Sequence, residues 1–172
     1  MAVRNEYIDA NVAAGKKGNA AKVSGGKLLC LEGTFEVAAA DTDASIFKLG
    51  KLPANAIPAK AEIFNDALTA GTDWDLGLYK DRGGANDVVA DVNIFLDAGD
   101  LSSGHAITAP LDGLTNLGGA DPIAAVGKKL WELLGLTDTT QAAENSYVLA
   151  LTANTIGSAA GTVSFRFWYI LG

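Results

Sequence analysis

The sequence predicts an all-β protein: an antiparallel, jelly-roll-like β-sandwich with one short helix and an extended N-terminal arm. Short apolar segments that alternate with period two recur along the chain between turns rich in Gly, Pro, Asn and Asp. A helical pattern occurs once, and no internal repeat is present. With 172 residues, 49% of them hydrophobic, the chain can bury one core. We therefore predict an arm over residues 1–27 and a sandwich body over residues 28–172.

Most predicted strands have clear boundaries. Leu28–Val37 begins with four consecutive apolar residues and then alternates, as expected of a strand that enters a core. The clearest alternation is in Asp73–Tyr79, where Trp74, Leu76 and Leu78 share one face. Further strands are predicted over Ser45–Leu52, Ala59–Asp66, Val88–Leu96, Tyr147–Asn154 and Thr162–Leu171.

Three segments need separate interpretation. Val88–Leu96 is apolar and fits a strand or a helix at its length, and we favour a strand. Gly99–Gly119 contains Ser-Ser-Gly and Gly-Gly steps, which predict a long surface loop. The last two strands are joined by Thr155–Gly161, which predicts a terminal hairpin.

The predicted helix has recognisable ends. Asp121 can cap it, Pro122 suits its first position, and Gly135 fits the residue just beyond its end. Apolar residues between these ends follow helical spacing from Ile123 to Leu134. The pattern predicts a short amphipathic helix packed on the body.

Charge is distributed unevenly along the chain. Residues 1–27 contain five Lys and Arg residues against two acidic ones, a net charge of +3, which leaves −10 for the remainder of a chain whose total is −7. A basic leader on an acidic body predicts an arm that binds an acidic protein surface, and a solvated tail is the alternative. The predicted partner-binding residues of the arm are Arg4, Tyr7, Lys16, Lys17, Lys22 and Lys27.

Composition excludes several classes of function. The single histidine, His105, lies in a small-residue loop without a nucleophile motif, and the single cysteine, Cys30, is predicted to be a buried hydrophobe. We therefore predict no enzyme activity, no zinc site, no other metal and no cofactor. The net charge of −7 argues against nucleic acid as a partner. No apolar run suits a membrane span or an export signal.

Asp73 and Asp75 are the strongest candidates for a catalytic pair. Alternate residues of a strand lie about 7 Å apart, a separation that two carboxylates use in glycoside hydrolysis. A solvated strand face explains the same spacing, and we prefer that interpretation.

The final strand has two apolar faces. Val163, Phe165 and Phe167 occupy one face, and Trp168 and Ile170 are prominent on the other. A second apolar face needs a cover, which a neighbouring subunit, the helix or the arm could each supply. We favour a subunit contact. The predicted oligomer interface consists of Arg166, Trp168 and Ile170.

Four stretches resemble the head decoration, or cement, proteins of tailed bacteriophages: Phe47–Ala56, Gly71–Tyr79, Leu130–Leu136 and Gly161–Phe167. The likeness spans Leu28 to Gly172 and consists of strands and turns without a chemically diagnostic motif. It implies a virion structural protein, made in the host bacterial cytoplasm, that sits on the outer capsid surface as a homo-oligomer, with a trimer favoured. Its implied partner is the major capsid protein, whose subunits it would bridge and stabilise.

A second hypothesis is a carbohydrate-binding or receptor-binding fibre module of a virion. In that case Trp168, Tyr79 or loop residues near His105 would contact a glycan on a host surface.

Overall fold

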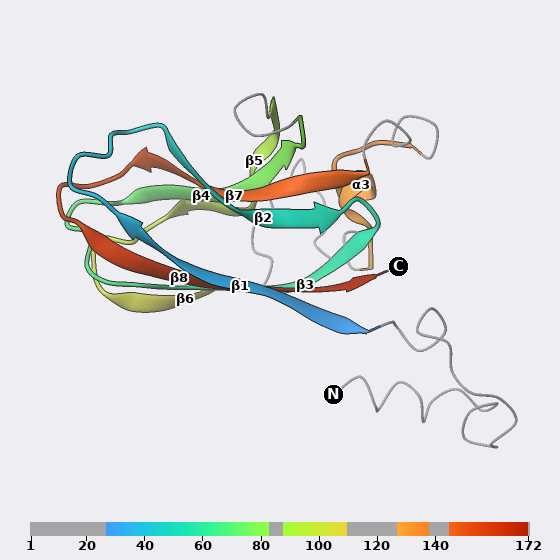
Figure 1. Ribbon diagram of the computed structural model, residues 1–172, viewed down its shortest axis with the longest axis horizontal. Coiled ribbons are helices and arrows are strands. Elements are labelled where there is room, and N and C mark those ends of the chain that lie inside the picture. Colours follow the sequence, from blue (N-terminus) through green and yellow to red (C-terminus); the bar gives the residue numbers. More distant parts are fainter. Residues whose placement is uncertain (1–26, 83–87, 110–126, 138–144, 172) are drawn as a thin grey trace, which may run out of the picture.

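The computed structural model describes residues 27–82, 88–109, 127–137 and 145–171, and these residues form two stacked β-sheets (Figure 1). Eight strands and one helical turn occur among them. Their bounds are β1 Leu28–Val37, β2 Ser45–Pro53, β3 Ala56–Asn65, β4 Asp73–Lys80, β5 Val88–Gly99, β6 His105–Ala109, α3 Leu130–Leu133, β7 Ser146–Thr155 and β8 Gly161–Leu171.

The strand order is that of a jelly roll. Sheet A has the order β1-β8-β3-β6 and sheet B the order β2-β7-β4-β5, with every neighbouring pair antiparallel. The first strand thus pairs with the last, the second with the seventh, the third with the sixth and the fourth with the fifth. Such nested pairing defines an eight-stranded jelly roll. The predicted fold class is confirmed.

Aromatic contacts join the two sheets. Phe35 of β1 stacks on Phe47 of β2 with a centroid distance of 4.8 Å, and Phe47 stacks on Trp74 of β4 at 5.7 Å. Farther inside, Phe95 of β5 meets Phe167 of β8 edge to face at 5.0 Å. Aromatic pairs of this kind contribute about 1 kcal/mol each beyond the burial of their surface. They fix the separation of the sheets in a core without disulfides.

The pairing of the edge strand β5 with β4 is irregular around Gly77. Opposite the single residue Gly77, β5 has four residues, because Leu76 pairs with Leu96 and Leu78 with Asp91. A Cβ atom at Gly77 would lie 2.1 Å from the carbonyl oxygen of Val92. Only glycine lets the two backbones approach this closely.

The last two strands do not form the predicted hairpin. Strand β7 pairs with β2 and β4 in sheet B, whereas β8 pairs with β1 and β3 in sheet A. The connection between them crosses from one sheet to the other, and its Gly157 has a φ of 95°. Ser158 donates a backbone hydrogen bond to Thr69, 3.0 Å away, which holds the crossing in place.

Two other predictions need correction. The segment expected to be a continuous surface loop contains β6, which pairs with β3. The predicted helix is not continuous: Gly127 has a φ of 80° and Lys129 is extended, so among the described residues only the turn Leu130–Leu133 is helical. Glu132 accepts a hydrogen bond from the backbone N–H of Lys129 at 2.7 Å, and Gly135 follows the turn as predicted, with a φ of 70°. Asp121 and Pro122 lie outside the described residues.

Candidate interaction surface

Sheet A has an outward surface, here called the outer face, formed by the residues of β1, β8 and β3 that alternate with core residues. Antiparallel register places these residues in rows across the three strands. Each row contains one residue of each strand. The rows are Leu28–Ile170–Ile57, Cys30–Trp168–Lys60, Glu32–Arg166–Glu62 and Thr34–Ser164–Phe64.

The charged row lies in the middle of the outer face. Arg166 on β8 places its Nε 3.4 Å from a carboxylate oxygen of Glu32 on β1, and its guanidinium carbon lies 5.8 Å from the ring centroid of Phe64. Lys60 forms an ion pair with Glu62. Both partners of the Arg166 pair are more than half exposed, so the pair contributes little to stability. These charges remain available to a partner.

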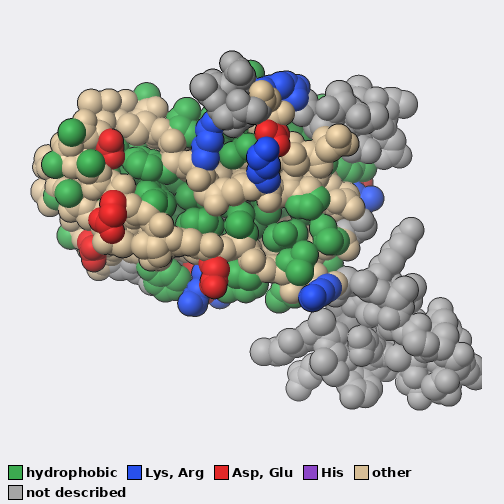
Figure 2. All heavy atoms as spheres, viewed as in Figure 1, with side chains coloured by type: hydrophobic (Ala, Val, Ile, Leu, Met, Phe, Trp, Pro, Cys, Tyr) green, Lys and Arg blue, Asp and Glu red, His purple; other side chains and the backbone are tan. Residues whose placement is uncertain are grey.

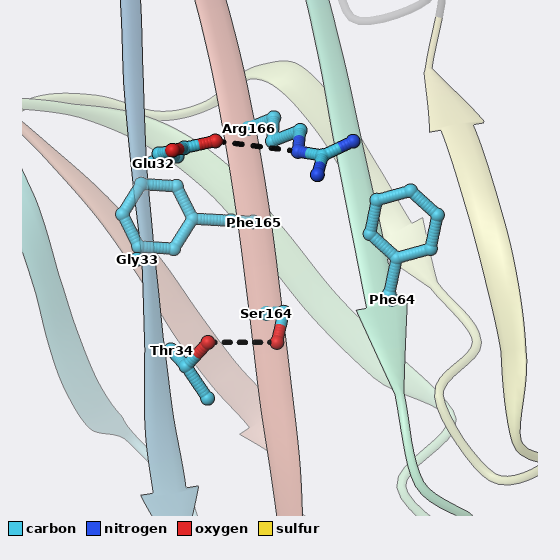
Figure 3. A pocket seen from close by; sticks show the side chains of 7 residues that line it. All are labelled: Glu32, Gly33, Thr34, Phe64, Ser164, Phe165 and Arg166. Atoms are coloured by element: carbon cyan, nitrogen blue, oxygen red, sulfur yellow. Dashed lines mark hydrogen bonds and ion pairs between the residues drawn. The ribbon is translucent and has the colours of Figure 1, made fainter.

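A shallow depression of about 630 Å³ opens beside Arg166 (Figure 3). In the close-up view the Arg166 side chain extends between Glu32 and Phe64, while Thr34 and Ser164 are joined across β1 and β8 by a 2.9 Å hydrogen bond. The depression is lined by Glu32, Gly33, Thr34, Phe64, Ser164, Phe165 and Arg166. Its mixture of an aromatic ring, hydroxyls and paired charges suits contact with another protein.

The other half of the outer face is apolar. Lys60 lies over the ring of Trp168, 5.2 Å from its centroid, and the neighbouring row consists of Leu28, Ile170 and Ile57. Leu28 is 49% exposed, and Ile57 and Ile170 are half-buried. Apolar side chains gathered on one exposed face are typical of a contact surface.

Cys30 also lies on the outer face. The prediction that it is buried is wrong: it is exposed, because the alternation of β1 directs its side chain away from the core. Partial desolvation, followed by the negative charge of Glu32, raises the pKa of its thiol. The thiol is therefore protonated at neutral pH and is a poor nucleophile.

The predicted oligomer-interface residues are brought together by the fold. Arg166, Trp168 and Ile170 alternate along β8 and all lie on the outer face. Of the predicted arm residues, Lys27 is exposed and directly precedes β1. The others, Arg4, Tyr7, Lys16, Lys17 and Lys22, lie outside the described residues. Sequence reasoning did not find Phe64 and Glu32, whose role depends on their register with Arg166.

The aspartate pair on β4 is not a solvated face. Asp75 is 4% exposed and accepts hydrogen bonds from the backbone N–H of Ala98 at 3.0 Å and from the Asn154 side chain at 2.7 Å. Asp73 accepts a bond from the same Asn154 amide at 3.0 Å. Ala98 has a φ of 52°, so the Asp75 carboxylate holds a strained turn of β5. These contacts give Asp75 a structural role.

Replacing Asp75 with alanine is expected to lower the free energy of unfolding by about 2 kcal/mol, since the Ala98 N–H loses a charged acceptor in a largely buried place. Urea denaturation of the variant measures this change. Asp73→Ala is the matched control, because among the described residues the Asp73 side chain accepts a hydrogen bond from the shared amide alone, and we expect a loss below about 0.5 kcal/mol for it. Equal losses for the two variants would contradict the assignment.

Tyr79 is likewise unavailable for glycan contact. It is 2% exposed, and its hydroxyl lies 2.8 Å from the Thr152 hydroxyl. His105 lies on β6, paired with Asn65. In the described part of the chain, no three metal-binding side chains form a cluster. No helix among those residues is both long and apolar enough to cross a membrane.

Comparison with solved structures places this fold among known ones. A chain in the capsid of Ralstonia phage GP4 matches with a TM-score of 0.58 and 18% identity, over 86% of each chain. The fold is shared with phage capsid chains. A chain of the capsid asymmetric unit of cyanophage Pam1 matches with a TM-score of 0.50 and 15% identity, again over 86% of each chain. No family model and no curated protein matches the sequence.

Proposed function

We propose that this chain is a virion structural protein that binds the outer surface of a phage capsid and stabilises it by bridging capsid subunits. The observation that carries the proposal is the jelly-roll likeness to a capsid chain of Ralstonia phage GP4 over 86% of both chains. Equal coverage of both chains means that the matched chain has about the same length as this one. The proposed role is structural and involves no catalysis.

Charge distribution favours decoration of a shell over formation of the shell. Acidic bodies with a net charge of −10 repel one another, which opposes a continuous wall built from the bodies alone. The leader, residues 1–27, has a net charge of the opposite sign. It joins the body at the exposed Lys27, next to β1 of the outer face. Its proposed contacts with the major capsid protein are made by Arg4, Tyr7, Lys16, Lys17, Lys22 and Lys27.

Self-association is the second part of the proposal. The apolar half of the outer face, around Trp168 and Ile170, is proposed as the contact between copies, with Arg166 at its charged margin and a trimer as the favoured state. Association multiplies the number of leaders that contact the capsid. Several weak contacts made by one oligomer bind much more tightly than any one of them.

Reversing leader charges tests the mechanism. The full-length variant Lys16→Glu, Lys17→Glu and Lys22→Glu is expected to bind purified heads of its phage at least 10-fold more weakly at low ionic strength, because it repels the acidic surface that the leader engages. Binding is measured by cosedimentation with the heads. The difference between variant and unchanged protein should shrink as salt is added.

The matched control reverses three lysines of the body: Lys48→Glu, Lys80→Glu and Lys128→Glu. It has the same change in net charge but leaves the leader intact. An equal loss of head binding in both variants would mean that total charge, and not the leader, drives attachment. Unchanged binding and unchanged thermal stability of heads with the leader variant would overturn the leader's role.

A glycan-binding module is the second candidate, because the Phe64 ring is 37% exposed beside Glu32 and Arg166 in the depression. A ring flanked by hydrogen-bonding groups is a suitable platform for a sugar. Glycan-array binding by the intact chain that is lost in Phe64→Ala would support this candidate over the first.

A further inference from the structure

The four edge strands of the sandwich differ in how they are protected against pairing with another chain. Strand β2 has a bulge between Lys48 and Gly50 and ends at Pro53, strand β5 has three register shifts, and β6 has five residues. Bulges, lysines, prolines and short length are the devices that keep edges from pairing. Strand β1 has no bulge, lysine or proline: its ten residues pair with β8 in an unbroken register, and its only charged residues are Glu32 and Glu36, which alternate with the inward side chains.

The free edge of β1 presents unpaired backbone groups. In an antiparallel ladder, alternate residues of an edge strand direct their N–H and C=O groups away from the neighbouring strand. Strand β1 is the last strand of sheet A. Among described residues, no backbone hydrogen bond outside the strand ladders involves Leu28–Val37. The chemical complement of such an edge is an extended polypeptide strand.

Apolar side chains border this edge. Between β1 and β2, Leu31 packs against Gly50 and Phe35 stacks on Phe47, and all four residues are only half-buried. The space-filling view from the same side shows hydrophobic side chains exposed along the boundary between the two sheets (Figure 2). A strand added beside β1 would cover them with its inward residues, provided that these are small or apolar.

We propose that the segment Ile8–Ala14 of a neighbouring copy pairs with the free edge of β1. Apolar residues occupy every second position of this segment, Ile8, Ala10, Val12 and Ala14, while Asp9 and Asn11 lie between them. This is the pattern of a strand with one covered face. Residues 1–27 contain no proline, so the segment can donate every backbone hydrogen bond of a ladder.

The residues between the segment and β1 favour a neighbour over the same copy. Residues 15–27 carry four of the five leader cations and no acidic residue, and a charged linker repels itself and extends. Thirteen extended residues span about 45 Å, enough to reach an adjacent body. If the leader instead folded back on β1 of its own copy, as a hairpin with Gly25-Gly26 as its loop, Lys22 and Lys16 would lie opposite Leu29 and Phe35. Both lysines would then lie on the apolar side of β1, which disfavours this arrangement.

The inference rests on the proposed function, since assembly on a capsid brings copies together, and it assigns a partner to part of the leader. Its register makes a direct prediction with the native Cys30, which is exposed on the outer face of β1. Side chains alternate between the two faces of a strand, so only every second residue of the added strand can lie beside Cys30. Because Ile8, Ala10, Val12 and Ala14 face inward in the proposed strand, the residues between them, Asp9, Asn11 and Ala13, lie on the outer side with Cys30.

The test is a cysteine scan in the full chain. Asp9→Cys, Ala10→Cys, Asn11→Cys, Val12→Cys and Ala13→Cys are oxidised separately with diamide, which takes up the two hydrogens released by each disulfide, on heads and in concentrated solution. Tagged and untagged copies are mixed so that links between copies are identified by size. Disulfides to Cys30 of another copy are expected at least fivefold more often from positions 9, 11 and 13 than from positions 10 and 12. They should be absent when Cys30→Ser is added to each variant.

Equal yields from both parities, links confined to one copy, or no link to Cys30 would each overturn the inference. Head binding of the same variants under reducing conditions is measured in parallel. Loss of the alternation with intact head binding would overturn only this inference. Intact alternation with a chain that does not bind heads would instead overturn the proposed function.

Discussion

Gly77→Ala is expected to lower the free energy of unfolding by about 3 kcal/mol or more, and the Tm by roughly 10 °C. The added methyl group would lie 2.1 Å from the carbonyl oxygen of Val92 and 2.2 Å from that of Asp91. Both are backbone atoms of β5, so no flexible side chain can move aside. The four-residue excursion of β5 would have to shift and uncover β4.

Differential scanning calorimetry of the variant measures this loss. Gly104→Ala is the control, because its Cβ would meet its nearest neighbour, the Asn65 carbonyl oxygen, at an ordinary distance of 3.4 Å. We expect the control to change the Tm by less than about 2 °C. A Gly77 variant as stable as this control would show that β5 does not lie against β4 as described.

Gly157→Ala is expected to be similarly damaging, for a second reason as well as a steric one. Its φ of 95° is unfavourable for any residue with a side chain, and the new Cβ would lie 2.1 Å from the Leu68 carbonyl oxygen. The connection between β7 and β8 would have to change its conformation where it crosses from one sheet to the other. We expect a loss of about 3 kcal/mol or more, measured by urea denaturation.

Gly135→Ala separates the two causes. Gly135 has a φ of 70°, but a Cβ atom there would meet nothing within 4 Å. Its replacement therefore carries only the conformational cost, about 1 kcal/mol. If both variants lost the same amount, the close approach to Leu68 would not contribute to stability.

Much of this architecture could be predicted from local sequence. The bounds of β1 agree with those expected, and the alternation of Trp74, Leu76 and Leu78 identified core residues, because a period of two is a local signal. The antiparallel sandwich followed from the number of short strands and their turns. These signals depend on neighbours within a few residues.

The errors arise where contacts between distant residues decide the outcome. The short connection between β7 and β8 suggested a hairpin, but both strands have partners more than 60 residues away. The Asp73 and Asp75 pair was assigned to a solvated face and Tyr79 to a glycan contact, yet Asp75 and Tyr79 are buried. Single-sequence patterns show that a strand alternates, but do not show whether both of its faces are covered.

The sequence located only part of the outer face, which is a candidate interaction surface. The alternation of Arg166, Trp168 and Ile170 identified one strand of the outer face. Its neighbours Glu32 and Phe64 could not be assigned to the same surface, since their positions follow from the registers of β1 and β3 with β8. The unprotected edge of β1 became visible only after the strand order was known.

The nesting of the first strand against the last has a kinetic consequence. Leu28 pairs with Ile170, so the β1–β8 ladder closes a loop that includes nearly the whole body. Contacts between residues so far apart in sequence slow folding to milliseconds or seconds. A ribosome must finish almost the entire body before β1 can find its place, and until then this apolar strand is exposed to aggregation. Fast synthesis of many copies would therefore favour aggregation of chains whose β1 is still unpaired.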